Sequence, residues 1–526
     1  MTEPSTTNGP PCPYENLVLE GGGAKGYAYV GALKELEELG WLRHFRRFAG
    51  ASAGAIMAAY LALKAPYDKI KQFSDVPMLE IAEDATCSSW SVWRYIPMLN
   101  NVLRYYGWHS GDGVLNYLKS TIQEICGDPD ITFIQAYEKY GTELCVSVAN
   151  VSKMRLEFFH PKLTPEVEIA VAVRMSMSIP GYFRPVKYHR NGTDCYYVDG
   201  GLLCNYPIHC FDGWYLSMKP ENSILNRLAS GTAGAPFSPE NEKTLGIVVY
   251  SATENDYMKP YVNQRYERVD ANPWPSTKLS RERKEKVERF EKSVEKSEEL
   301  FKLAKEVGEI ILEAQAAVVG EEVCVTKDSV ISLLNKIGKD RYEKLTGEEF
   351  DPESAYHAME KECEGNDKML YSALVRHLDT KGLFFRELSK FNEFTADTGA
   401  APAYFSSVLN SVRVTTDRYY LKRSDAARTV GIDTQYLEVM DFKLEEGDKA
   451  FLIKQGSNAV KGFMLEKIQM QGPRRFAASD RDRPTPRGGL PGPDITPYIS
   501  RFEGIITPPW EADPKSNFAD KGISIY

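Results

Sequence analysis

The sequence predicts an α/β fold with a central, mostly parallel sheet and helices on its faces. Apolar strand-like runs alternate with helical stretches through the first half of the chain, a rhythm typical of such sheets. Two of the strand-to-helix steps, at 21–26 and 50–54, consist almost wholly of glycine, alanine and serine. The chain has 526 residues of which 43% are apolar, enough to bury a large core.

The expected elements of this sheet lie on both sides of the two steps. Period and composition favour strands at 16–19, 45–48, 144–148, 155–159, 195–198 and 245–250. The same reasoning favours helices at 27–39, 53–63 and 166–175.

A serine stands at the centre of the second step, in the pattern Gly-x-Ser-x-Gly. Ser52 is flanked by Gly50, Ala51, Ala53 and Gly54. A sharp turn from strand to helix needs such small neighbours and leaves the hydroxyl at the helix N-terminus, where the dipole favours a developing oxyanion. The pattern predicts a nucleophile elbow, although by itself it also fits a small-residue turn without chemistry.

The first step is a glycine loop that follows directly on the first strand. The loop is the run Gly21, Gly22, Gly23, Ala24, Lys25 and Gly26. Consecutive glycines let several backbone N–H groups point toward one place, which is what an oxyanion hole requires. We expect the N–H groups of residues 22–24 to be the donors.

The glycine loop has an alternative interpretation as a dinucleotide fingerprint. Its glycines also satisfy G-x-G-x-x-G between a strand and a helix. The position that normally carries an acidic residue for the ribose holds Arg43, Arg46 and Arg47, which would suit a phosphorylated ribose. An NADP-binding protein therefore stays an alternative, weakened by the serine elbow on the next strand.

An aspartate at the end of a later strand is the third candidate catalytic motif. Asp199 is followed by Gly200 and Gly201, which form a tight turn. A carboxylate in this place can take the proton of Ser52 without a histidine if folding brings the two within hydrogen-bond reach. His109 and His209 lie near these motifs, but their spacing does not favour a triad.

These motifs resemble those of the patatin-like phospholipases, serine lipid acyl hydrolases that use a Ser-Asp dyad. The segments 172–185, 201–208, 428–442 and 456–463 are similar to further parts of that family. The resemblance implies a patatin-like three-layer α/β/α fold, with Ser52 as nucleophile, Asp199 as base and the glycine loop as oxyanion hole. It also implies a phospholipase A or lysophospholipase activity through an acyl-enzyme, without a cofactor.

The resemblance is interrupted in the middle of the chain. We expect a flexible N-terminus at 1–13, the first catalytic part at 14–258, a helical insertion at 259–403, the closing catalytic part at 404–466 and a Pro/Gly/Arg-rich tail at 467–526. The insertion begins with a charged, amphipathic helix from about Ser276, followed by helical patterns at 329–337, 368–378 and 384–391. It is either a helical hairpin on its own core or a lid or docking surface for lipid, an activating protein or a nucleotide.

Charge and cysteine usage limit the partners. The formal charge of −9 disfavours a nucleic acid as substrate. Nine cysteines without a C-x-x-C pair or a zinc-like spacing favour no metal and a reducing compartment. The N-terminus has no apolar signal segment and the longest apolar run, 55–63, is too short to span a bilayer. We therefore expect a cytoplasmic protein that touches a phospholipid membrane surface peripherally, and a signal-peptide-independent secretion route stays open.

Overall fold

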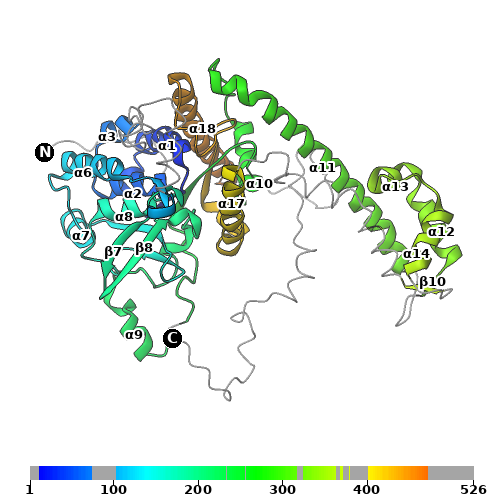
Figure 1. Ribbon diagram of the computed structural model, residues 1–526, viewed down its shortest axis with the longest axis horizontal. Helices are drawn as coiled ribbons and strands as arrows, with labels where there is room; N and C mark the ends of the chain where they lie inside the picture. Colours follow the sequence, from blue (N-terminus) through cyan, green and yellow to red (C-terminus); the bar gives the residue numbers. More distant parts are fainter. Residues whose placement is uncertain are drawn as a thin grey trace. The chain divides into compact units, whose positions relative to one another are not determined.

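The computed structural model describes residues 11–73, 102–232, 234–254, 256–316, 324–362, 368–370, 378 and 401–471 (Figure 1). The chain forms two compact units. The first comprises 1–296 and 386–477, and the second comprises 297–385 and 478–526. The N-terminal 1–10, the segment 384–391 and nearly all of the tail lie outside the described residues.

The first unit is built on an eight-stranded sheet with the order β12-β9-β1-β2-β4-β8-β7, and β5 pairs with β4. The strands are β1 Asn16–Leu19, β2 Arg47–Gly50, β4 Glu143–Asn150, β5 Arg155–Phe159, β7 Val186–Arg190, β8 Thr193–Asp199, β9 Thr244–Tyr250 and β12 Thr429–Asp433. The run from β12 to β4 is parallel, whereas β5, β8 and β7 join by antiparallel pairing. The predicted α/β fold with a mostly parallel sheet is confirmed.

Helices and short 3-10 turns surround this sheet. The helices are α1 Tyr27–Glu38, α2 Ser52–Ala62, α3 Tyr67–Gln72, α6 Asp112–Cys126, α7 Phe133–Tyr140, α8 Ile169–Ser176, α9 Ile224–Ala229, α10 Lys259–Val262, α17 Ala401–Tyr420 and α18 Glu446–Gln471. The 3-10 segments used below are η1 Gly23–Gly26, η5 Gly200–Leu202, η6 Ile208–Phe211, η8 Asn263–Arg268 and η10 Arg423–Arg428. A small parallel pair, β3 Gly107–His109 and β6 Gly181–Phe183, stands apart from the main sheet.

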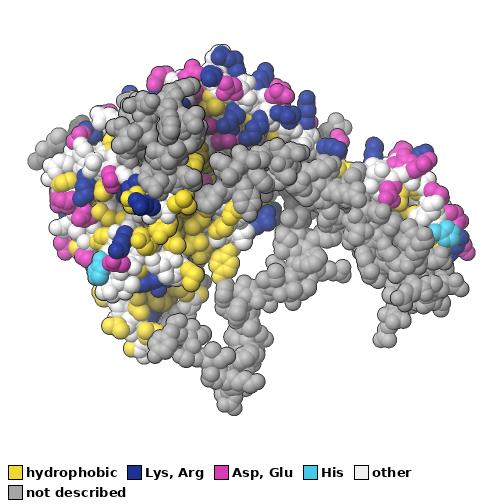
Figure 2. Space-filling view, in the orientation of Figure 1, with side chains coloured by type: hydrophobic (Ala, Val, Ile, Leu, Met, Phe, Trp, Pro, Cys, Tyr) yellow, Lys and Arg dark blue, Asp and Glu magenta, His cyan; other side chains and the backbone are white. Residues whose placement is uncertain are grey.

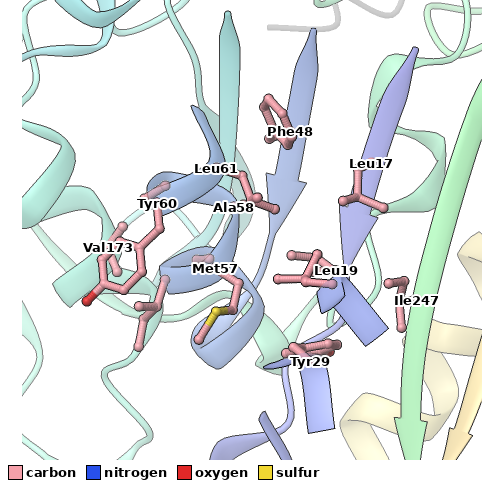
Figure 3. Close-up of a cluster of buried hydrophobic side chains, with 14 of the residues drawn as sticks. Leu17, Leu19, Tyr29, Phe48, Met57, Ala58, Tyr60, Leu61, Val173 and Ile247 are labelled. Atoms are coloured by element: carbon pink, nitrogen blue, oxygen red, sulfur yellow. The ribbon is translucent and has the colours of Figure 1, made fainter. Parts of the chain in front are cut away.

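Alternate side chains of the strands supply two separate cores. Leu17 and Leu19 of β1 face a large cluster that includes α1, α2, α8 and α18, and Figure 3 shows its centre around Met57. Val18 faces the opposite side, where η6 and α10 contribute. Because successive residues of a strand point to opposite faces, one four-residue strand is buried on both sides.

Helices α1 and α18 lie in very close contact on the first of these faces. A Cβ placed on Gly31 would fall 1.7 Å from the carbonyl oxygen of Ile453, and one on Gly456 would fall 1.9 Å from that of Ala28. Only glycine fits at these two positions. The closing segment of the catalytic fold is therefore tied to its beginning across more than 400 positions of the chain.

The second unit has a core of its own. It contains α12 Lys327–Ile337, α13 Lys339–Thr346, α14 Pro352–Glu362 and the antiparallel pair β10 Cys324–Thr326 and β11 Lys368–Leu370. The long helix α11 Lys278–Ala316 continues from the first unit into it. Val330, Leu334 and Tyr342 are among its buried residues. The helix predicted at 368–378 is wrong at its start, since 368–370 pairs with β10 as a strand.

The boundary of this unit differs from the predicted insertion at 259–403. Residues 259–296 belong to the first unit, because Val262 and Val287 are buried in its two cores. Arg265 of η8 pairs with Glu466 at 2.7 Å, which ties the same stretch to α18. The change in charge pattern near Ser276 marks a surface helix and not the edge of the domain. No helix in the described part of the chain is long and apolar enough to cross a membrane.

Candidate active site

The turn between β2 and α2 holds Ser52 in a strained backbone conformation. Ser52 is the first residue of α2 and has φ +49°, in the left-handed region that serine rarely adopts. A Cβ on Gly50 would lie 2.4 Å from the carbonyl carbon of Gly54, and a Cβ on Gly54 would lie 2.4 Å from the carbonyl oxygen of Leu19. The small residues are therefore required by close backbone contact, as the elbow pattern predicts.

Ser176 stabilises this turn from the end of α8. The backbone N–H of Ser52 donates to the Ser176 hydroxyl oxygen at 2.9 Å, and that hydroxyl donates to the carbonyl of Ser147 at 2.7 Å. All three residues are buried. Ser176 was not among the predicted site residues, and the one available signal was its place in the segment 172–185 that resembles the family.

The sheet register brings Ser52 and Asp199 together. On β4, Val146 pairs with Gly50 of β2, whereas Val148 pairs with Asp199 of β8. Because β2 runs parallel and β8 antiparallel to β4, their carboxyl ends approach each other. The Ser52 hydroxyl lies beside the Asp199 carboxyl and favours its charged form. Two groups about 150 positions apart in sequence thus meet at one point.

Burial sets the protonation of Asp199. Desolvation raises the pKa of its carboxyl to about 7, although the N–H of Gly201 and the Ser52 hydroxyl favour the charged form. The Gly201 N–H donates to Oδ1 at 2.7 Å. A Cβ on Gly200 would lie 2.0 Å from the carbonyl oxygen of Ser147, so the Asp-Gly-Gly turn is also dictated by packing. A carboxyl that titrates near neutral pH is suited to accept and return a proton.

The glycine loop lies directly against the elbow. A Cβ on Gly21 would be 3.2 Å from the Cβ of Ser52, and one on Gly26 would be 3.0 Å from the Cβ of Ala53. Gly23 has φ +52°, and a Cβ there would fall 2.3 Å from the carbonyl oxygen of Val439. The structure thus brings the predicted loop, elbow and aspartate into one site.

The N–H groups of the loop do not all have the predicted role. The N–H of Ala24 donates to the carbonyl of Val439 at 2.9 Å, so the expectation that it serves as an oxyanion donor is wrong in this structure. The N–H groups of Gly21 and Lys25 are also occupied, by the carbonyls of Asn205 and Gly22. Within the described residues, the N–H groups of Gly22 and Gly23 have no hydrogen-bond acceptor. The N–H of Ala53, in the first turn of α2, is a third candidate because such groups lack intrahelical partners.

Two side chains that the sequence analysis missed hold the loop in place. The Asn205 amide donates to Oε1 of Glu20 at 2.8 Å and to the carbonyl of Gly21 at 3.0 Å. The other carboxyl oxygen of Glu20 accepts the N–H of Val249 at 2.8 Å. The loop is therefore anchored to β9 on one side and to the segment after Asp199 on the other.

A buried group of charges lies next to this anchor. The ammonium of Lys25 is 2.6 Å from Glu254 and donates to the carbonyl of Val249 at 2.8 Å. Arg413 of α17 lies 4.0 Å from Glu20 and 3.7 Å from Asp417. Burial alone would raise the pKa of Glu254, but the positive charges of Lys25 and Arg413 hold this pKa at about 2. Lys25, predicted as part of the oxyanion loop, thus pairs with Glu254 and fixes the loop to β9.

The histidines have other surroundings. The ring of His209 stacks on Tyr420 with 4.8 Å between centroids, and burial lowers its pKa to about 4. His109 packs against Tyr182 at 4.9 Å. Among the described residues, no group of histidine, cysteine or acidic side chains could hold a metal ion.

The arginines of the dinucleotide alternative lie at the wrong edge of the sheet. Arg47 opens β2 and pairs with Asn16 at the amino end of β1, whereas the glycine loop follows Leu19 at the carboxyl end. Three residues of strand separate the two ends by about 10 Å. Arg47 therefore lies at the opposite edge of the sheet from the loop, where it could not contact a ribose phosphate held by the loop.

A serine elbow, a buried aspartate and a glycine loop at the carboxyl edge of an α/β sheet define a class of fold and site, and comparison with known proteins gives the family. The patatin-like phospholipase family model matches residues 17–212. The uncharacterized protein YqhO of Bacillus subtilis (strain 168) is 31% identical over 243 residues, which are 44% of this chain and 74% of YqhO. The chain belongs to the patatin-like phospholipase family.

Other similar proteins are of viral and bacterial origin. The probable lipid hydrolase 463L of Invertebrate iridescent virus 6 is 29% identical over 37% of this chain, and protein R571 of Acanthamoeba polyphaga mimivirus is 30% identical over 38%. The match spans 62% and 61% of these two proteins. Among solved structures, VipD of Legionella pneumophila covers 87% of this chain and 68% of its own at 15% identity and a TM-score of 0.38.

Proposed function

We propose that this protein is a serine lipid acyl hydrolase that cleaves fatty-acyl esters of phospholipids, as a phospholipase A or a lysophospholipase. The observation that carries the proposal is the juxtaposition of the Ser52 hydroxyl and the buried Asp199 carboxyl beside the glycine loop. Membership of the patatin-like phospholipase family and similarity to a protein named as a probable lipid hydrolase support it.

The first half of the reaction forms an acyl-enzyme. Asp199 accepts the proton of the Ser52 hydroxyl while the Ser52 oxygen attacks the carbon of the ester carbonyl. The π electron pair of the C=O bond moves onto the carbonyl oxygen. When the C–O bond to the glycerol oxygen breaks, Asp199 returns the proton to that leaving oxygen. The fatty acyl group stays on Ser52 as an ester.

The second half removes the acyl group with water. Asp199 takes a proton from the water while the water oxygen attacks the acyl carbon. The proton passes to the Ser52 oxygen when the ester bond to the enzyme breaks. The products are a fatty acid and the regenerated hydroxyl. In these two halves the chain supplies the first nucleophile and the proton acceptor, and water supplies the second nucleophile.

The negative charge that develops on the carbonyl oxygen needs donors in both halves. Among the described residues, the N–H groups of Gly22 and Gly23, with that of Ala53, lack acceptors and are the proposed donors. Each such donor is worth about 3 kcal/mol of activation free energy in comparable enzymes. The anchoring of the loop by Asn205 and Lys25 keeps these donors in place without reorganisation during the reaction.

A fluorophosphonate probe tests this proposal. We expect labelling at Ser52, identified by mass spectrometry of the modified peptide, together with release of fatty acid from phospholipid micelles. Ser52→Ala should abolish both signals and Asp199→Asn should lower both. Ser251→Ala is the matched control, because Ser251 is buried and its hydroxyl has no hydrogen-bond partner among the described residues. Hydrolysis that persists in Ser52→Ala would reject the proposed nucleophile.

We also propose that the protein acts from the cytoplasm in transient contact with a membrane, and that the second unit is where an activating protein or a nucleotide docks. The separate core around Val330 and Leu334 supports this role, because the unit can present a surface without help from the sheet. Deletion of 297–385 should leave the basal rate of phospholipid hydrolysis unchanged. It should abolish any increase in this rate that cell extract causes in the full chain. A rise that survives the deletion would contradict docking on this unit.

A further inference from the structure

Six apolar or aromatic side chains form an exposed group that the proposed chemistry does not use. We call this group the apolar ridge: Leu103, Tyr105, Tyr106, Val151, Met154 and Tyr196, which are 72%, 46%, 61%, 51%, 89% and 39% exposed. The rings of Tyr106 and Tyr196 meet at 6.1 Å between centroids. Val151 donates its N–H to the carbonyl of Tyr196 at 2.9 Å. The segment before β3, the turn after β4 and strand β8 therefore meet in one place.

The apolar ridge lies at the same edge of the sheet as the candidate active site. Val148 of β4 is paired with Asp199, and β4 then continues to Asn150 and into the turn that carries Val151 and Met154. Val151 is three residues beyond Val148, about 10 Å along the strand. The ridge thus begins one short step outward from the Asp199 carboxyl.

Two residues of the ridge hold a backbone conformation that opposes folding. Tyr106 has φ +63° and Met154 has φ +49°. Among the described residues, six other than glycine have a positive φ, and these two alone carry large apolar side chains. Glycine or asparagine would relieve this strain. Tyr106 and Met154 therefore each combine a strained backbone conformation with an apolar side chain exposed to water. Both features lower the stability of the isolated chain.

Charge selects the kind of partner. Arg104 and Lys153 are exposed between members of the ridge and have no ion-pair partner in the described part of the chain. These two positive charges are opposite in sign to the formal net charge of the protein, which is −9. Apolar side chains interspersed with unpaired cations match a surface that has hydrocarbon below and phosphate above, which is the surface of a phospholipid bilayer.

We propose that the apolar ridge inserts into the facing leaflet of a phospholipid bilayer, with Arg104 and Lys153 against the lipid phosphates. This inference deepens the proposed function, because it names the surface through which Ser52 meets its lipid. Met154, at the tip of the turn, enters deepest. The rings of Tyr106 and Tyr196 lie at the boundary between hydrocarbon and water, where aromatic side chains with a polar end are favoured.

The test measures binding of the full chain to vesicles in a Ser52→Ala background, so that no lipid is consumed. The vesicles contain phosphatidylcholine with a minority of phosphatidylglycerol, and bound protein is separated by sedimentation. The double variant Tyr106→Asn/Met154→Asn should bind on the order of tenfold more weakly, because two apolar side chains are lost from the contact. Its thermal stability should not fall, since asparagine tolerates a positive φ. Lys153→Glu should weaken binding to the anionic vesicles and leave binding to pure phosphatidylcholine nearly unchanged.

The matched control is Leu225→Asn on α9. Leu225 is 79% exposed, and Figure 2 shows hydrophobic side chains at the surface of this helix. This variant should bind as its parent does. Equal binding of the double variant and its parent would overturn the proposal, as would an equal loss in Leu225→Asn. A parent that is a dimer, and becomes a monomer in the double variant, would overturn it in favour of contact between two copies.

The outcome is separable from that of the proposed function. With Ser52 intact, the double variant should hydrolyse a soluble short-chain ester at the parent's rate and phospholipid in vesicles more slowly. If neither substrate is hydrolysed by the parent, the proposed chemistry fails, but the vesicle-binding comparison still decides the role of the ridge.

Discussion

The hydroxyl of Ser52 and the carboxyl of Asp199 meet at one point, although their strands reach it from opposite directions. The contact depends on β4, where the partners of Gly50 and Asp199 are only two residues apart. A shift of either strand by one pair would move the two groups out of reach. The chemistry of the site is thus fixed by sheet register as much as by the identity of the two residues.

The pKa of Asp199 predicts how hydrolysis depends on pH. Burial raises this pKa to about 7, and only the ionised carboxylate accepts the Ser52 proton. The value of kcat/KM should therefore rise with pH and level off above about pH 7. The measurement uses a soluble ester, so that binding to a lipid surface does not contribute. A rate that stays constant from well below to well above pH 7 would contradict this assignment.

The same pKa predicts a gain in stability in Asp199→Asn. Because the folded-state pKa is raised above the unfolded value, the folded protein binds the extra proton between about pH 4 and pH 7, and its stability falls as the pH rises through that window. Asparagine cannot ionise and keeps an oxygen for the Gly201 N–H. The variant should be more stable than the wild type at pH 8, by up to about 4 kcal/mol for a shift of about three pKa units. Urea unfolding at pH 4 and pH 8 measures the difference, which should nearly vanish at the lower pH.

Ser176→Ala tests whether the elbow needs its hydrogen bond from α8. The substitution leaves the buried N–H of Ser52 without an acceptor, which should cost about 1–3 kcal/mol of unfolding free energy. A displaced nucleophile should also lower kcat by about tenfold. Ser251→Ala removes a buried hydroxyl that has no partner among the described residues and should change neither quantity. Equal behaviour of the two variants would show that Ser176 does not hold the elbow.

The local elements were largely predictable from the sequence. The strands β1 and β5 have the predicted bounds, since each is a compact apolar run between turn residues. Strand β2 was predicted two residues too early, at 45–48, because the sequence pattern does not show that the strand must run up to Gly50 before the elbow. The three motifs were found for a physical reason: each needs small residues in one short stretch.

What the sequence could not give is the contact between distant parts. Ser176 and Asn205 act on partners 124 and 184 positions away, so no local spacing reports them. The N–H of Ala24 was wrongly predicted as an oxyanion donor. Its acceptor is the carbonyl of Val439, which belongs to a loop far along the chain and is not visible in the local sequence. The order of the strands, and the joining of β8 to β4, likewise follow from packing between elements.

Gly23→Ala tests the glycine loop. Gly23 has φ +52°, and its Cβ would fall 2.3 Å from the carbonyl oxygen of Val439, so the loop must shift and carry its N–H groups away from Ser52. We expect kcat to fall at least about tenfold, since one oxyanion donor is worth about 3 kcal/mol. Gly127→Ala is the control, because Gly127 has φ +82° with no atom within 4 Å of the new Cβ. It should cost about 1–2 kcal/mol of stability through strain alone and leave kcat unchanged.

Arg413→Met tests how α17 is joined to the site. Arg413 lies among the carboxyl groups of Glu20, Glu254 and Asp417, and without it less positive charge is left to balance them. Removing one partner of a buried ionic group leaves charges uncompensated, at a cost of about 3–5 kcal/mol.

The loss in Arg413→Met should depend on pH with a definite sign. Without the guanidinium the folded-state pKa values of these carboxyls rise, so they take up protons more readily at low pH and the penalty is smaller at pH 5 than at pH 8. Urea unfolding at both pH values measures it. Arg418→Met, an exposed arginine on the same helix, should change stability by no more than about 0.5 kcal/mol. Similar losses in the two variants would mean that Arg413 does not balance the buried carboxyls, and the anchoring of the glycine loop would then rest on Lys25 and Asn205.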